Sequence, residues 1–584
     1  MTNRNYGALS TIEEGAGSTG ALTEASMETD SPILEDEQQQ PPNTLKKKPL
    51  FVTLLITALL IGLDVHRRQG KRADILSVGS RAGESYGMFH VAASDYEEPL
   101  TIRRYFEGQP VDNFDTSSAA ATWSHPYFTS DTYFAGPGHP IFVILGGEGP
   151  IHGILYPYVS KRMAKEFGAY VLQTEHRFYG ASQPVGDNPT TEQLLQLFTP
   201  EQAIADYIRI IQALQTKLGC SPSRSSKQYC PIVTIGASYP GFLSAIMRMR
   251  YGHVVDIGWA ASAPMILNAH EPHANTNAYF DKVACVAEEA YPGCIDGTYR
   301  TLEELHSYIL QSDSVMNVAH DLGICLDTLP EYLQAGSLQD FAIALTQLVV
   351  NVNADMNMAY YPPTSDNVFL PKVCSIFAAQ DDDSTAVERY ANFLKMIITF
   401  NDYREANPSS FECFDVQTQL ADGNNPTIAS ADWTGSGYGQ TGSRWEFQVC
   451  KDLVIKTGIG ATDVNMFYPP RPWTMDWLTS HCESRFGTDF VAPEEGRLNA
   501  MWHFDDLSGV NKLLFTNGER DGWSVGSYME VPPSADDATS IAVVNFPNGS
   551  HHSELGHSWP RDGDTEDILR GRDQIIELLR TWLS

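Results

Sequence analysis

The sequence predicts an α/β fold with a parallel-rich central sheet and a large, mainly helical cap insertion. Short β-branched apolar runs alternate with helical stretches between about residues 140 and 261, which is the pattern of a parallel sheet with crossover helices. A segment of different texture, residues 271–495, then interrupts this pattern, and strand-like runs resume only after it. The early part also contains the sequence GASYPG, a variant of the G-x-S-x-G pattern with proline at the last position, directly after a strand-like run.

Composition narrows the class of protein. The chain has 584 residues, too many for one ordinary domain, and its 42% hydrophobic and 19% charged residues are typical of globular proteins. A net charge of −33 argues against nucleic acid or an anionic membrane surface as partner. None of the nine cysteines forms a C-x-x-C pair, which argues against zinc and dithiol redox sites. No metal or cofactor is expected. In a secretory compartment the cysteines would form disulfides and leave one thiol over.

The first hundred residues show no core pattern. Residues 1–45 are polar and are predicted to be disordered. Three lysines then precede an apolar run at 49–63, which is short for a membrane span of roughly 17–25 residues and also fits a signal-peptide core. Because the region before it is long for a cleaved signal, we expect an uncleaved signal anchor with a cytosolic N-terminus.

The elements beyond this region are read from their apolar periodicity. Strands are expected at 141–145, 169–173, 257–261, 512–516 and 540–546, with one more leading from residue 232 into the GASYPG sequence. Helices are expected at 156–167, 200–218, 242–250, 301–310, 338–350 and 567–583.

These expectations divide the chain into six parts. They are a disordered cytosolic tail at 1–48, a signal anchor at 49–65, a stem at 66–95, a first α/β part at 96–270, a helical cap domain at 271–495 and a second α/β part at 496–584. Seven of the nine cysteines fall in the expected cap.

The sequence GASYPG, which differs from the G-x-S-x-G pattern by a proline at its last position, identifies a candidate nucleophile. Residues 232–241 read IVTIGASYPG, a β-branched run that turns at Ser238 into a helical run. This is the nucleophile elbow of an α/β-hydrolase, in which a sharp strand-to-helix turn holds a serine hydroxyl above the sheet edge. Gly236 and Gly241 would let the turn close without Cβ clashes. Pro240 lies at the start of the helix, where a missing N–H costs little.

A serine nucleophile needs a base, and the base needs a carboxylate that fixes its tautomer. In this fold class the order along the chain is serine, acid, histidine, each acid and base on a loop after a strand. Asp521 and His551 meet both conditions. Glu519 is a rival acid and His552 a rival base on the same loops.

An oxyanion hole needs two backbone donors. The N–H of Tyr239, directly after the nucleophile, is the first candidate. Gly147 ends an earlier strand in a glycine pair, where side chains would obstruct close approach, and is the second candidate.

Several long motifs together resemble the family of prolyl carboxypeptidase, dipeptidyl peptidase II and thymus-specific serine protease. They are residues 146–149 (GGEG), 175–182 (EHRFYGAS), 236–239 (GASY), 445–450 (WEFQVC), 517–523 (NGERDGW) and 551–552 (HH). The resemblance runs from about residue 100 to the C-terminus and is nearest to the thymus-specific branch. It implies an α/β-hydrolase with a helical cap that acts as a lysosomal or secreted serine peptidase. It also implies the triad Ser238, Asp521 and His551, and a disulfide between Cys450 and Cys482.

Four positions depart from the family's prolyl exopeptidases. Gly147 and Pro150 stand where those enzymes usually carry Asn and Asp, Gly522 stands where they have Pro, and Pro240 replaces a small residue. These departures leave exopeptidase mode, whether dipeptidyl-peptidase or carboxypeptidase, and preference for proline open. They do not touch the nucleophilic chemistry.

The expected function is therefore hydrolysis of short peptides through an acyl-enzyme, with proline or hydrophobic residues as the preferences to test. An esterase or lipase on the same fold and a catalytically inert binding protein are the alternatives. The expected partners are peptides and, through the N-terminal segment, a membrane; a homodimer is left open. The expected location is the secretory or endolysosomal pathway, as a single-pass type II or secreted protein. The sequon at Asn548 is expected to carry little glycan, since a glycan there would crowd the loop of His551.

Overall fold

The computed structural model describes residues 100–117, 120–268, 275–329, 334, 336–379, 384–405, 413–415, 439–487, 490, 496–535, 540–558 and 560–584. The expected tail, signal anchor and stem lie outside this part of the chain. Across the residues that are described, no helix combines the length and apolar character needed to cross a membrane.

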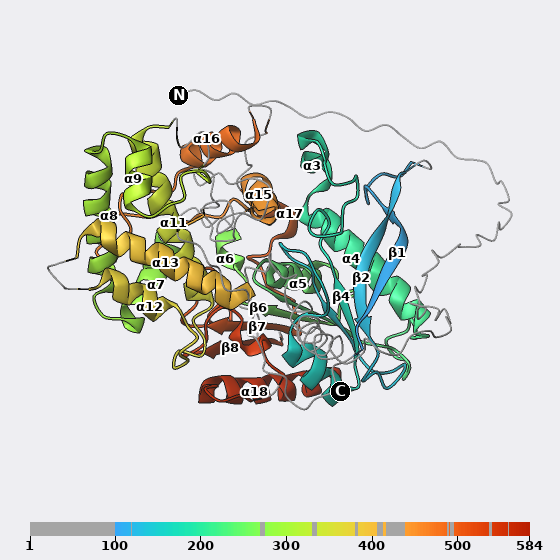
Figure 1. Ribbon diagram of the computed structural model, residues 1–584. Coiled ribbons are helices and arrows are strands. Elements are labelled where there is room, and N and C mark those ends of the chain that lie inside the picture. The colour runs from blue at the N-terminus through green and yellow to red at the C-terminus, as the bar shows by residue number, and fades with distance from the viewer. Residues whose placement is uncertain are drawn as a thin grey trace, which may run out of the picture.

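One eight-stranded sheet forms the centre of the molecule, with strand order β1-β2-β4-β3-β5-β6-β7-β8 (Figure 1). Strands β3 to β8 run parallel, whereas β1 pairs antiparallel with β2 and β2 antiparallel with β4. The strands are β1 (Ile102–Pro110), β2 (Thr122–Ser130), β3 (Ile141–Ile144), β4 (Tyr170–Thr174), β5 (Ile232–Ala237), β6 (Ile257–Ala261), β7 (Leu513–Gly518) and β8 (Ile541–Phe546). The predicted parallel-rich α/β sheet is confirmed.

Helices cover both faces of this sheet. Side chains alternate along a strand, so Ile141 and Val143 of β3 enter one hydrophobic core, and Phe142 and Ile144 enter the other. The first core contains α4 (Pro200–Lys217) and α5 (Tyr239–Arg250). The second contains η1 (Tyr158–Met163), α2 (Ala164–Phe167) and α18 (Glu566–Leu583). A short helix, α3 (Thr191–Leu197), precedes α4.

The chain between β6 and β7, here called the β6–β7 connection (residues 262–512), carries most of the remaining helices. In Figure 1, α7 to α13 gather on the side of the molecule opposite β1 and β2. The helices are α6 (Met265–Asn268), α7 (Ala278–Ala290), α8 (Cys294–Leu310), α9 (Val315–Asp321), α11 (Leu338–Met358), α12 (Leu370–Phe377), α13 (Ala386–Glu405), α15 (Gly439–Gln448), η3 (Val449–Leu453), α16 (Met475–Phe486) and α17 (Arg497–Trp502).

Two helices of the β6–β7 connection reach the loop that follows β7. This loop contains the short helix η4 (Gly522–Gly526). The ring of Tyr279 on α7 lies 4.3 Å from the ring of Trp523, measured between centroids. Asn357 on α11 is hydrogen-bonded to the same loop through Gly522. The connection therefore packs against the edge of the sheet from which the β7 loop emerges.

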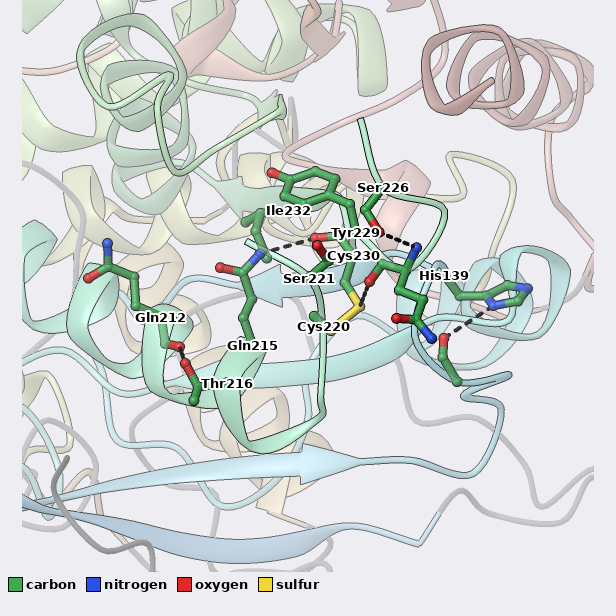
Figure 2. Close-up of a disulfide and its surroundings, with 12 residues drawn as sticks. His139, Gln212, Gln215, Thr216, Cys220, Ser221, Ser226, Tyr229, Cys230 and Ile232 are labelled. Carbon is green, nitrogen blue, oxygen red and sulfur yellow. Dashed lines mark hydrogen bonds between the residues drawn. A yellow bond between two sulfur atoms is a disulfide. The ribbon is translucent and has the colours of Figure 1, made fainter. Parts of the chain in front are cut away.

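Four disulfides cross-link the described residues, among which Cys285 is a free cysteine. Cys450–Cys482 confirms the pairing implied by the family resemblance. Cys220–Cys230 closes the turn between α4 and β5, and Figure 2 shows it just ahead of Ile232, where the strand leading to Ser238 begins. Gln215 of α4 donates to the carbonyl of Cys230 over 3.1 Å. The remaining pairs are Cys294–Cys374 and Cys325–Cys413.

Candidate active site

Ser238 occupies the strained turn that the sequence predicts. Its backbone has φ 60° and ψ −128°, a left-handed region that residues with a side chain rarely adopt. Its N–H donates to the carbonyl of Ala261 on β6 over 2.8 Å, which fixes the turn to the sheet. A Cβ added at Gly236 would lie 2.1 Å from the carbonyl oxygen of Pro240, so the turn cannot close around a larger residue. The elbow geometry is therefore present.

The two oxyanion candidates lie beside this turn. Tyr239 is the first residue of α5, where the backbone N–H has no partner within the helix. Gly147 packs against the ring of Pro240, since a Cβ added at Gly147 would lie 2.4 Å from Pro240 Cγ. The N–H of the neighbouring Gly146 instead donates to Thr174 Oγ1 over 3.1 Å. Gly147 is thus the residue of the glycine pair that faces the elbow.

The predicted acid and base are in direct contact. Asp521 Oδ2 lies 2.6 Å from His551 Nδ1, and both side chains are buried. A carboxylate can only accept, so Nδ1 donates and the lone pair of the neutral ring is at Nε2. The other oxygen of Asp521 accepts from the N–H of Trp523 over 2.9 Å, which orients the carboxylate. This is the acid–base geometry that serine activation requires.

Neither rival residue takes part in this hydrogen bond. Glu519 is exposed to solvent. His552 has its N–H bound to Ser262 Oγ at 3.0 Å, and its ring lies beside that of His551 with centroids 4.6 Å apart. Burial lowers the pKa of His552 well below its ordinary value. The Asp521 carboxylate contacts His551, so the geometry favours Asp521 and His551 over their neighbours.

Sheet register brings the three residues to one edge. Ala237 of β5 pairs with Ala261 of β6, and Gly518 of β7 pairs with Phe546 of β8. These parallel strands therefore end together, and Ser238, Asp521 and His551 each follow the end of one of them. The carboxyl edge of a parallel sheet is the usual place for ligand-binding loops.

A small pocket opens over Ser238. Its walls are mostly apolar and come from both sides of the site. The sheet edge contributes Glu148 and Trp523, and the β6–β7 connection contributes Pro264, Met358, Trp445 and Ile455. Of the aromatic residues in the middle part of the β6–β7 connection, Trp445 lines this pocket. Phe447 and Phe467 are buried in the core, Trp473 and Trp477 pack against that core, and Trp433 lies outside the described residues.

Behind the elbow, a buried hydrogen-bond chain holds the Tyr239 side chain. His176 Nδ1 donates to the carbonyl of Arg177 over 2.7 Å, so His176 Nε2 is an acceptor. The Tyr239 hydroxyl, 3.0 Å away, donates to it, and Gln448 Nε2 donates to the same hydroxyl over 3.2 Å. Tyr179 completes the chain by donating to Gln448 Oε1 over 2.7 Å. The chain thus joins the EHRFYG and WEFQVC motifs to the elbow.

This chain works only with a neutral histidine. Burial lowers the pKa of His176 to about 4 and raises the pKa of Tyr239 well above its ordinary value. Both groups therefore stay uncharged over the neutral and mildly acidic range, and each hydrogen bond has one donor and one acceptor. Tyr239 is held from its side chain while its backbone N–H stays at the elbow.

Several residues of the site were not predicted from the sequence. Asn357, Met358, Ile455 and Pro264 line or support it but belong to no motif. No local signal marks them, since each reaches the site through the path of the β6–β7 connection. Glu148 lies inside the quoted glycine motif, and its position there is the one signal that pointed to it.

Together, the fold and the site define a serine hydrolase of the α/β-hydrolase class. The chain belongs to the family described as serine carboxypeptidase S28, which it matches over residues 109–575. The protein is accordingly a serine-type peptidase.

Curated relatives agree with this assignment. The chain is 24% identical to human lysosomal Pro-X carboxypeptidase over 514 residues, covering 85% of this chain and 92% of that protein. It is also 24% identical to the mouse thymus-specific serine protease, covering 81% of this chain and 86% of that protein. Among solved structures it is similar to a bacterial heroin esterase, with 12% identity, a TM-score of 0.32 and coverage of 84% and 87% of the two chains.

Proposed function

We propose that Ser238, His551 and Asp521 form a catalytic triad with which the protein hydrolyses short peptides. The observation that carries this proposal is the 2.6 Å contact between His551 and Asp521 at the sheet edge where the Ser238 elbow lies. His551 Nε2 would take the proton of Ser238 as its oxygen attacks the peptide carbonyl, and would return it to the leaving amine. Water would then hydrolyse the acyl-enzyme by the same route.

The backbone N–H groups of Tyr239 and Gly147 would bind the oxyanion that forms in each step. Tyr239 is suited to this because its ring is fixed by His176 and Gln448. Gly147 is suited because its contact with Pro240 holds the glycine loop against the elbow. Such preorganised donors stabilise developing charge at no reorganisation cost.

The pocket over Ser238 supports a preference for an apolar residue on the acyl side of the scissile bond. Met358, Trp445, Ile455 and Trp523 offer flat and aliphatic surfaces that fit a proline ring or a similar apolar side chain. The printed names of relatives, among them Pro-X carboxypeptidases, favour proline as the first residue to test.

We propose that residues 271–495 act as a cap domain between two α/β parts, 96–270 and 496–584. Met358, Trp445 and Ile455 from this segment lie over the nucleophile, so a folded protein chain would meet the cap before reaching Ser238. Short peptides are therefore the expected substrates.

The test uses one cleavable sequence in three forms: a free peptide, the same peptide as a loop in a folded protein, and a short-chain ester. Hydrolysis of the free peptide alone is the expected result. Equal cleavage of the loop would show that the cap does not restrict access, and turnover of the ester alone would point to an esterase. A series that varies the acyl-side residue from proline to leucine to aspartate would measure the preference of the pocket.

We also propose that the chain works in the secretory or endolysosomal pathway. Four disulfides suit an oxidising compartment, and the human and mouse relatives include proteins named as lysosomal. In this proposal residues 49–65 form a signal anchor of a single-pass type II protein. Carbonate extraction of the full chain tests it: release of the intact protein from membranes would contradict the anchor.

A further inference from the structure

Asn357, the penultimate residue of α11, contacts both sides of the acid residue. Its side-chain Nδ2 donates to the carbonyl of Arg520 over 3.0 Å, and its Oδ1 accepts from the N–H of Gly522 at 2.8 Å. Arg520 and Gly522 flank Asp521. The Asn357 side chain and the N–H of Gly522 are buried, so this N–H relies on Asn357 rather than on solvent.

The main chain at the same point of α11 contacts the loop of the base. The hydroxyl of Ser550 donates to the carbonyl oxygens of Asn357 and Met358, the second over 3.0 Å. Ser550 is buried and directly precedes His551. One turn of one helix is thus bonded to the residues on either side of Asp521 and to the residue before His551.

An amide side chain is the group that suits this position. It can donate to one backbone carbonyl and accept from one backbone N–H at the same time, whereas a carboxylate only accepts and an aliphatic group does neither. The surroundings leave the turn little freedom to move. A Cβ added at Gly522 would lie 2.8 Å from Val283 and 2.9 Å from Tyr279, both on α7.

We propose that Asn357 is a positioning residue that holds Asp521 against His551. The cap helix α11 then contributes to proton transfer as well as covering the active site. This inference rests on the proposed triad. Asn357 touches neither substrate nor the reacting atoms, and it acts by fixing the two loops relative to each other.

Substitutions at Gly522 can test its hydrogen bond to Asn357. Its N–H is one of the two groups that Asn357 binds, and a proline at 522 would have no N–H to donate. Gly522→Ala and Gly522→Pro both add a Cβ to the same crowded site, and only the second removes the donor. The difference between them reports the lost hydrogen bond to Asn357 together with the added ring atoms and the stiffer backbone that proline imposes on Gly522 and Asp521.

The principal test compares Asn357→Leu with Asn353→Leu. Asn353 is buried on the same helix, and its Nδ2 donates to the carbonyl of Val349 within that helix. Active sites are counted by titration with a fluorophosphonate, which reacts with an activated serine, and kcat and KM per active site and the labelling rate are then measured.

We expect Asn357→Leu to lower kcat per active site by about 10- to 100-fold with KM little changed, since small misplacements of a catalytic group cost up to that much. We also expect the rate of fluorophosphonate labelling to fall, because the label reacts with the same activated serine. Asn353→Leu should change neither quantity. An unchanged kcat per active site and an unchanged labelling rate in Asn357→Leu would overturn the proposal, whatever the loss in thermal stability.

If Asn357→Leu does not fold, the Gly522 pair decides. Lower labelling and turnover in Gly522→Pro than in Gly522→Ala support the proposal, and equal values overturn it. The labelling rate needs no peptide, so this inference can be separated from the proposed substrate class. A wild-type protein that labels at Ser238 but hydrolyses no peptide contradicts the peptidase proposal alone, and the Asn357 comparison then runs on labelling rates.

Discussion

The proposed nucleophile and the proposed acid–base pair are held by different means. Ser238 follows β5, which has β3 and β6 as parallel neighbours, and its N–H is bonded to Ala261 on the adjacent strand. Asp521 and His551 follow β7 and β8, at one end of the sheet, and their loops are bonded to α11. The nucleophile is thus fixed by the sheet itself, and the acid–base pair by a helix outside it.

The two sides also differ in how far apart along the chain their contacting residues lie. The elbow is determined within the ten residues 232–241, with Gly236 and Pro240 in contact across the turn. The bond between Asn357 and Gly522 joins positions 165 apart in the chain. A change at Asn357 can therefore alter proton transfer while it leaves the backbone of the Ser238 turn in place.

Ser238→Ala is the most direct test of the elbow side, because it removes the proposed nucleophile. We expect loss of covalent labelling and a fall in kcat of roughly 10⁶-fold, as for other triad serines, because no other group can form the acyl-enzyme. The fold should be retained, since the hydroxyl is replaced by hydrogen and the backbone bond to Ala261 remains. Labelling of the variant at the wild-type rate would move the nucleophile elsewhere.

The acid–base side is tested by the two adjacent histidines. His551→Ala should reduce kcat nearly as much as Ser238→Ala, because it removes the partner of Asp521. His552→Ala should reduce it clearly less, since His552 contributes packing and a backbone bond to Ser262. Turnover per folded molecule is the measurement, and the opposite ranking would make His552 the base.

The elbow side and the parallel strands could be predicted from the sequence because their signals are local. Strand β6 was predicted at its observed bounds, and β7 and β8 to within two residues at either end. Strands buried on both faces show continuous β-branched runs. Strands β1 and β2 were not predicted. Their residues mix apolar, charged and polar side chains, as antiparallel strands near a sheet edge often do, so no apolar run marks them.

On the acid–base side, Asp521 and His551 could be predicted from the sequence, but the contacts that hold their loops could not. The order along the chain and the strand before each loop pointed to Asp521 and His551. Nothing near Asn357 in the sequence shows that it lies against Gly522, because that contact depends on how the β6–β7 connection folds back. The pairing of Gly147 with Pro240 is similar: each was noted as a departure from the family, and the structure shows that they contact each other.

The disulfide between Cys450 and Cys482 lies in the β6–β7 connection, which also contains the helix α11 that contacts the acid–base loops. Replacing both cysteines by serine should lower the free energy of unfolding by roughly 3–4 kcal/mol in the chain-entropy model for a loop of this length. The bond lies in the β6–β7 connection, so the loss should appear first there, as faster hydrogen exchange in α15 and α16. Removing Cys220 and Cys230, which close a loop of 10 positions, is the matched control and should cost less.

The buried chain behind Tyr239 predicts a pH effect on stability. Because burial lowers the pKa of His176 to about 4, the unfolded chain takes up this proton below its ordinary pKa near 6.5 and the folded chain does not. The free energy of unfolding should therefore fall as pH drops from about 6.5 to about 4, by up to ~1.4 kcal/mol per pH unit from this residue.

His176→Gln is the variant that tests this effect, since glutamine offers Tyr239 an acceptor but does not titrate. Urea unfolding at several pH values should give a shallower decline for the variant than for the wild type across the same interval. Equal slopes would mean that His176 does not hold a depressed pKa.

The smallest effect is expected at Asn548, at the start of the loop that carries His551. Its side chain donates to Asp567 over 3.2 Å, its N–H to the same carboxylate over 2.9 Å, and Ser550 of the sequon is buried against α11. A glycan on Asn548 would displace these bonds and crowd the acid–base side, so we expect the site to be unoccupied in active protein. Intact-mass measurement should give the same glycan mass for wild type and Asn548→Gln, with kcat nearly unchanged. Full occupancy together with full activity would contradict this prediction, because it would show that the His551 loop accommodates a glycan.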